Sequence, residues 1–142
     1  MIDSDILIID FDGANRVLHL SAKTPVPVRT DSELDLMCGA VYKILEKLCE
    51  SDRVYMIVDI GKIIIDPSLT EKYSAKIQML KEKFIYRGGL ARYGMNVTRV
   101  TIMLGYKRHL LDEQNIFPSY EAARRYIDSL IAEPNSLVEK AD

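Results

Sequence analysis

Apolar and polar positions along the chain predict seven elements, of which the first two form a hairpin. Residues 5–11 are rich in branched aliphatic side chains, and residues 16–22 alternate apolar and polar ones. The string Asp12–Asn15 between them is typical of a tight turn, because its glycine tolerates positive φ. Residues 24–28 contain two prolines, which exclude a helix and favour an extended crossover segment able to pair at a sheet edge.

Three later segments repeat apolar residues at intervals of three and four, as amphipathic helices do. They are residues 31–50, 68–86 and 119–132. Thr30 and Ser68 each stand three residues before a glutamate, which is the pattern of a capping box at a helix start. The pair Gly88–Gly89 is typical of a helix end and predicts where the second helix stops.

The remaining two segments predict the centre of a sheet. Residues 54–60 are almost wholly apolar, as in a parallel strand covered on both faces, and residues 98–104 read as a second such strand. Strands separated by amphipathic helices indicate crossover units. We therefore expect one α/β domain over residues 1–133, ordered β-β-α-β-α-β-α, with a mixed sheet of about four strands and helices covering it. Residues 134–142 are expected to form a flexible C-terminal tail.

Composition narrows the function classes. The 142 residues include 19 basic and 21 acidic side chains, a net charge of −2, which argues against a general nucleic-acid binder. No apolar run approaches the roughly 20 residues of a membrane span. Cys38 and Cys49 fall on one predicted helix about 16 Å apart, too far for a disulfide between them. Free thiols and an acidic N-terminus without a signal peptide predict a cytoplasmic protein.

Several short strings, together with the order of elements, resemble a known family. They are Val58–Gly61 at the end of a buried strand, Asp66–Ser68 before a helix, Phe117–Ser119, Glu121–Ala122 and Tyr126–Ile127. In these the chain is similar to STAS domains, the class of anti-sigma-factor antagonists, and in particular to the SpoIIAA-like branch. The resemblance spans the chain from the hairpin to Ile131. It implies a module that binds a protein or senses a ligand rather than an enzyme.

Topology and polar residues point to one candidate site. Ligands of open α/β sheets bind beyond the carboxyl ends of the parallel strands. The loops expected there are 61–67 and 105–116, and they follow the strand end at Asp59. The candidates for phosphorylation or interaction are Ser68, Asp59 and Asp66. The candidates for binding an anion or a partner are Lys62, Lys107, Arg108 and His109.

Each candidate also has a structural interpretation, which the residue types favour. A phosphate on Ser68 would be stabilised by free N–H groups at a helix start, but a serine in this pattern is more often only an N-cap. Asp59 could pair with Lys62 or position a partner, yet such residues usually bond to loop N–H groups. The basic triplet Lys107–His109 could bind an anion, or it could simply be solvated.

No pattern of catalytic residues, dinucleotide-binding glycines or zinc ligands occurs, so we expect neither metal nor cofactor.

The first hypothesis for the function is a non-catalytic regulatory module that binds another protein through the carboxyl-end loops and the helix of residues 68–86. The alternative is a carrier or sensor of a small anionic or lipid-like ligand, which would need an apolar pocket of about 300 Å³ or more. A third, an enzyme with an unrecognised site, would need titratable groups with perturbed pKa values in a cleft. The edge of the hairpin could also support a homodimer.

Overall fold

A computed structural model describes residues 6–133 of the chain. Its elements follow one another in this order: β1 (Leu7–Asp12), β2 (Val17–Ala22), β3 (Val26–Val28), α1 (Asp31–Leu48), β4 (Val54–Asp59), β5 (Ile63–Ile65), η2 (Pro67–Leu69), α2 (Thr70–Phe84), β6 (Ile85–Tyr93), α3 (Thr98–Lys107), β7 (Ile116–Phe117) and α4 (Tyr120–Ala132). The short 3-10 helix η2 leads directly into α2. The tail expected at residues 134–142 lies outside the described residues.

The main sheet has five strands in the order β1-β2-β4-β6-β7. β1 and β2 form the expected antiparallel hairpin, whereas β2, β4, β6 and β7 run parallel to one another. A second sheet, here called the minor sheet, consists of the parallel strands β3 and β5. The expected α/β fold with a mixed sheet is therefore confirmed, with one more strand in the main sheet than predicted and with residues 24–28 contributing β3.

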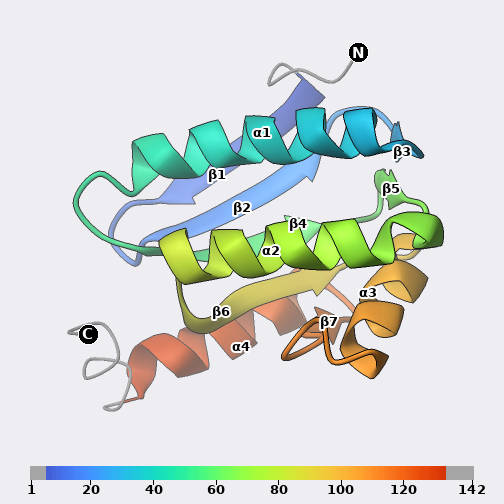
Figure 1. The fold of residues 1–142 in the computed structure, drawn as a ribbon. Helices are drawn as coiled ribbons and strands as arrows, with labels where there is room; N and C mark the ends of the chain where they lie inside the picture. The colour runs from blue at the N-terminus through green and yellow to red at the C-terminus, as the bar shows by residue number, and fades with distance from the viewer. Residues whose placement is uncertain (1–5, 134–142) are drawn as a thin grey trace.

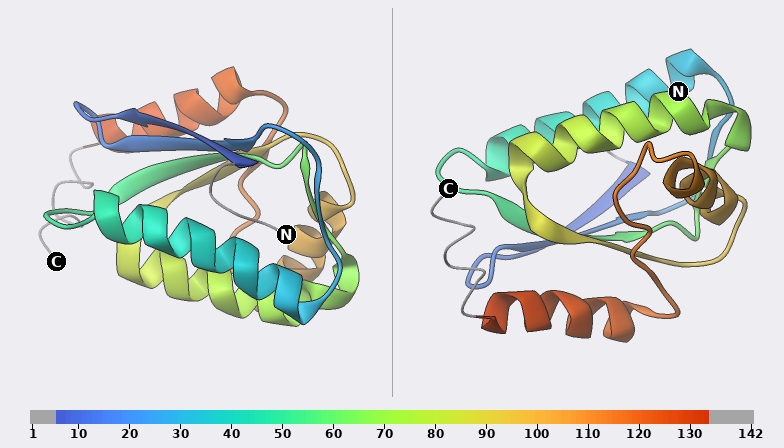
Figure 2. Two further views of the ribbon diagram at one scale, coloured as in Figure 1. Left: turned by 90° about the horizontal axis from the view of Figure 1, so that it is seen from above. Right: turned by 60° about the horizontal axis from the view of Figure 1, so that its bottom comes forward.

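Helices cover both faces of the main sheet. Figures 1 and 2 show α1 and α2 side by side on one face and α4 on the other, with α3 packed at the end of the molecule where β5 lies. Leu18 and Leu45 are fully buried between the sheet and α1, and Ile57 and Ile127 are fully buried between the sheet and α4. The apolar periodicity thus located α1, α2 and α4 within their predicted ranges.

The prediction of a strand at residues 98–104 is wrong, because these residues lie in α3. The branched side chains favour a strand locally, but tertiary contacts decide otherwise. The Thr98 hydroxyl donates to the carbonyl of Ile63 and accepts from the N–H of Ile65, while the Thr101 hydroxyl donates to the carbonyl of Ile65. Ile102 is fully buried beside the minor sheet, so the helix presents Thr98, Thr101 and Ile102 to that sheet.

The strand next to β4 is β6, so the expected pairing of residues 54–60 with residues 98–104 does not exist.

The pair Gly88–Gly89 does not end a helix, since α2 ends at Phe84. It lies in an irregular part of β6, between the pairings of Ile85 with Val54 and of Leu90 with Met56. A Cβ atom on Gly89 would lie 2.8 Å from the Tyr55 ring, so the close approach of β4 requires glycine.

Candidate functional site

At the carboxyl edge of the main sheet, β4 ends at Asp59 beside Tyr93 at the end of β6. Asp59 Oδ1 accepts a hydrogen bond from the N–H of Gly61 at 2.8 Å, as such residues do in turns. Gly94, with φ of +116°, packs so closely on this loop that a Cβ atom there would lie 2.6 Å from the Gly61 nitrogen. The structural interpretation of Asp59 therefore accounts for its side chain.

Lys62 belongs to the same loop and links it to a neighbouring segment. Its Nζ donates to the carbonyl of Lys23, just beyond β2, at 3.2 Å. Within residues 6–133 no ion pair joins Lys62 to Asp59 or Asp66. The pairing considered for Lys62 and Asp59 is thus replaced by a contact with the backbone.

Asp66 and Ser68 lie in direct contact, but with roles different from those expected. Asp66 is the N-cap of η2, and its Oδ2 accepts from both the N–H (2.9 Å) and the hydroxyl of Ser68. These hydrogen bonds lower the pKa of the Asp66 carboxyl. Ser68 is not an N-cap, because α2 begins only at Thr70 and Pro67 starts the preceding turn. The Ser68 side chain is exposed and held by Asp66.

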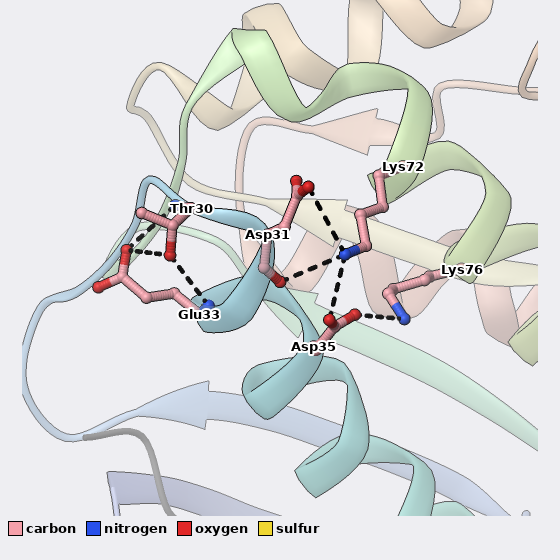
Figure 3. Close-up of polar contacts among 6 residues, drawn as sticks. All are labelled: Thr30, Asp31, Glu33, Asp35, Lys72 and Lys76. Atoms are coloured by element: carbon pink, nitrogen blue, oxygen red, sulfur yellow. Dashed lines mark hydrogen bonds and ion pairs between the residues drawn. The ribbon is translucent and has the colours of Figure 1, made fainter.

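The start of α1 lies beside this turn, because β3 and β5 run parallel and deliver both helix starts to one corner. The Asp66 N–H donates to the carbonyl of Val28 at 3.0 Å. The predicted capping box at Thr30 is confirmed: its hydroxyl accepts from the Glu33 N–H, and the Glu33 carboxylate accepts from the Thr30 N–H (Figure 3). Carboxylates of the chain itself, Glu33 and Asp66, therefore occupy the start of α1 and the turn η2 before α2, which disfavours an external anion at these two places.

Ion pairs between α1 and α2 continue from that corner. Asp35 lies 2.9 Å from the ammonium of Lys76 and 3.1 Å from that of Lys72, which also approaches Asp31 (Figure 3). The hydrogen bond from Lys76 lowers the pKa of Asp35, and the same bond raises the pKa of Lys76. Asp31 and Asp35 of α1 are thus paired with Lys72 and Lys76 of α2 across the two helices.

The basic triplet lies at the far end of α3 from this corner. Lys107 is the last residue of the helix, Arg108 caps it, and His109 adopts a positive φ of 60°. All three side chains are exposed. In the described part of the chain no hydrogen bond or ion pair connects them to Asp59, Asp66 or Ser68. The loop of residues 105–116 leads into β7 rather than following a parallel strand, so the seven candidates do not share one rim as expected.

Exposed apolar side chains gather instead where α3 faces β7. The exposed fractions are 76% for Met95, 40% for Val97 and 38% for Val100. A groove of about 480 Å³ separates Val100, Arg99 and Met103 on α3 from residues 114–117, which lead into and form β7. We call this region the α3–β7 surface, defined by these residues: Met95, Val97, Arg99, Val100, Met103 and 114–117.

The interior, by contrast, is closely packed. A cavity of about 60 Å³ lies between the main sheet and the helices α1 and α2, and its lining is almost wholly apolar. Cys38 lines it, and burial raises the pKa of this thiol to about 11. Pockets that hold small organic ligands usually measure about 300 to 1,000 Å³. The cavity is therefore too small for a lipid-like molecule.

One cluster of titratable groups joins α4 to the sheet. His19 Nε2 lies 2.7 Å from the hydroxyl of Tyr93, and the Tyr120 ring packs on the histidine with centroids 4.6 Å apart. Burial lowers the pKa of His19 and raises that of Tyr93 to about 12. Neither residue lines the groove or the cavity. The cluster packs His19 against the first turn of α4.

No family model, curated protein or solved structure matches the chain. Over residues 6–133, no group of three or more His, Cys, Asp or Glu side chains is placed to hold a metal ion. No described helix combines the length and the apolar character needed to cross a membrane.

Sequence reasoning missed the α3–β7 surface for a specific reason. The branched side chains of residues 98–104 predict a strand covered on both faces, and such a strand would expose none of these side chains as a surface. Val97, Val100 and Met103 repeat at intervals of three, which places them on one face of a helix. That spacing was the available signal, and the branched residues between these positions concealed it.

Proposed function

We propose that the chain is a non-catalytic regulatory module of the STAS or SpoIIAA-like type, which binds another protein through the α3–β7 surface. One observation carries the proposal: Met95, Val97 and Val100 are exposed together beside a groove of about 480 Å³. Apolar side chains that cluster at a surface are typical of protein contacts. The family assignment continues to rest on the strings at Val58–Gly61 and Asp66–Ser68.

The small-ligand alternative has less support. A carrier needs a pocket that can enclose its ligand, and the apolar cavity measures only about 60 Å³. The groove beside α3 is larger, but it is open to solvent along a helix face. This difference favours a macromolecular partner over an enclosed small molecule.

Ser68 keeps a place in the proposal as a site of modification. Its exposed hydroxyl donates to Asp66, so a phosphate there would remove that hydrogen bond and set negative charge against a carboxylate. We expect the turn before α2 to open as a result. If Ser68→Asp binds the partner as Ser68→Ala and the unmodified chain do, this switch does not operate.

The proposal is tested by affinity capture from a native lysate with quantitative mass spectrometry. The baits are the tagged wild-type chain, Val100→Asp and the matched control Leu36→Asp, whose side chain on α1 is 50% exposed. We expect one partner to be retained by the wild type and the control and depleted about tenfold by Val100→Asp. Equal retention by all three baits, or no enrichment over an empty resin, would contradict the proposed function.

A further inference from the structure

The charges of the chain are divided unevenly. Residues 84–111, which include β6 and α3, contain no acidic residue and five basic ones, namely Arg87, Arg92, Arg99, Lys107 and Arg108. All 21 acidic side chains and the other 14 of the 19 basic ones lie elsewhere in the chain, whose net charge is −2. Of these five, only Arg99 belongs to the α3–β7 surface, because Arg92 is buried and Arg87 lines a different pocket.

The groove carries one of these charges. Arg99 lines it among otherwise uncharged residues, and its guanidinium contacts the sulfur of Met95. No carboxylate of the described residues forms an ion pair with Arg99. A charged group on an apolar wall gains most from a partner of opposite sign, which also fixes the register of binding.

The other wall of the groove ends in a sheet edge. β7 is the outermost strand of the main sheet and pairs with β6 on one side. The outer side of such a strand presents backbone groups that an extended peptide can pair with. Ile116 and Phe117 are half-buried there and face the groove from the strand side. β7 has only two residues, so side-chain contacts must supply much of the affinity.

We propose that the α3–β7 surface binds an extended peptide segment with an acidic residue between apolar ones. The segment pairs with the outer edge of β7, its apolar side chains enter the groove against Val100 and Met103, and its carboxylate pairs with Arg99. This inference rests on the proposed function and specifies the partner's chemistry. An anionic membrane offers similar charge, but a concave groove with a single arginine fits a narrow chain better than a flat surface.

The test ligand is a display library of random twelve-residue linear peptides, selected on the full chain. We expect the enriched peptides to alternate apolar residues with Asp or Glu. A synthetic copy of the best peptide should bind Arg99→Glu about tenfold more weakly than the wild type and should bind Leu36→Asp unchanged. Replacing its acidic residue by Lys should restore binding to Arg99→Glu. Amide hydrogen exchange at Ile116, whose N–H lies on the outer side of β7, should slow when the peptide binds.

Several results would overturn the inference. They are enrichment without acidic residues, equal affinity of Arg99→Glu and wild type, and no added protection at Ile116. Self-association of the chain that Arg99→Glu abolishes would make a second copy the occupant. If no peptide is selected and the chain binds phosphatidylserine vesicles in a way that Val100→Asp abolishes, the occupant of the α3–β7 surface would be a membrane. If Val100→Asp loses the native partner while the peptides show no acidic preference, only this inference fails; if Val100→Asp keeps that partner, the proposed function fails.

Discussion

The α1–α2 layer and the α3–β7 surface differ in what holds the start of their helices. α1 starts with a capping box of its own residues Thr30 and Glu33, and α1 and α2 are joined by ion pairs from Asp35. At the start of α3 the N-cap residue Val97 supplies no side-chain bond, although Asn96 Oδ1 accepts from the Thr98 N–H. Threonine hydroxyls bonded to the minor sheet hold its first turns. The start of α1 is thus fixed by neighbours in sequence, whereas the first turns of α3 are also held by contacts across the fold.

This difference extends to the outer surfaces. On α1 and α2, charged side chains near the helix starts satisfy one another, as Asp35 does with Lys72 and Lys76. On α3, apolar Val100 faces a groove together with Arg99, which forms no ion pair with a residue in the range 6–133. A helix fixed by tertiary contacts on its inner face leaves its outer face available for a partner. We infer that the charged side chains near the starts of α1 and α2 leave little there for a partner to satisfy, whereas the apolar Leu36 and Met79 remain exposed further along these helices.

The largest expected effect tests whether α3 is as firmly docked as α1. Ile102 on α3 and Leu34 on α1 are both fully buried. Truncation of either to Ala removes buried methyl groups and leaves a cavity, so we expect each to lower the free energy of unfolding by about 3 kcal/mol. Urea denaturation followed by circular dichroism measures both, and Leu36→Ala on the exposed side of α1 serves as the near-neutral control. A loss under about 1 kcal/mol for Ile102→Ala alone would show that α3 is loosely attached.

The sequence was sufficient to predict an element where its local and tertiary preferences agree. The helical stripe of α1, its capping box at Thr30 and the hairpin turn at Asp12–Asn15 are encoded within a few residues. The sequence misled where local and tertiary preferences conflict. Residues 98–104 have the branched side chains of a strand, yet Thr98 and Thr101 bond to carbonyls on β5, a partner 33 to 36 residues away in sequence.

The candidate site shows the same limit. The contact of Asp66 with Ser68 spans two residues and lies within reach of sequence reasoning, although Pro67 shifted the helix start and changed which residue caps it. The separation of Lys107–His109 from that contact depends on α3 being a helix. An error in one element therefore placed residues together that the fold keeps apart.

The second prediction removes the tertiary anchor of α3. Thr98→Val keeps the size of the buried side chain but deletes its hydroxyl, which leaves the N–H of Ile65 without its acceptor. We expect a loss of about 2 kcal/mol in the free energy of unfolding, because an unsatisfied buried donor is costly. Thr24→Val, the same change at an exposed position, is the control. Equal stability of the two variants would mean that the hydroxyl does not hold α3.

The third prediction removes the local anchor of α1. Thr30→Ala deletes the side-chain acceptor of the Glu33 N–H, so we expect a loss of about 1 kcal/mol, typical of an N-cap. Ser32→Ala provides the control, because Ser32 lies two residues later in the first turn and is exposed. The ratio of this loss to that of Thr98→Val, measured in the same denaturation series, compares local with tertiary anchoring directly. A larger loss at Thr30 than at Thr98 would reverse the contrast between the two helices.

The smallest expected effect concerns the ion pairs between α1 and α2. Hydrogen bonds from Lys76 and Lys72 lower the pKa of Asp35 below its ordinary value of 3.8. A carboxyl with a lowered pKa stabilises the folded state above the unfolded pKa, and that contribution disappears as the pH falls through the folded pKa. Asp35→Asn should therefore be slightly less stable than the wild type near neutral pH, and the gap should close below a pH of about 3.8.

The control for this variant is Glu46→Gln, which removes one negative charge from an exposed position of α1 outside the ion pairs among the described residues. Added salt should narrow the gap for Asp35→Asn, because exposed charges are screened. If the gap is the same at both ends of the pH range, the two helices do not depend on this carboxylate for their contact. Capping and apolar burial would then be the source of the order in the α1–α2 layer, and the contrast with α3 would rest on how each helix starts rather than on surface charge.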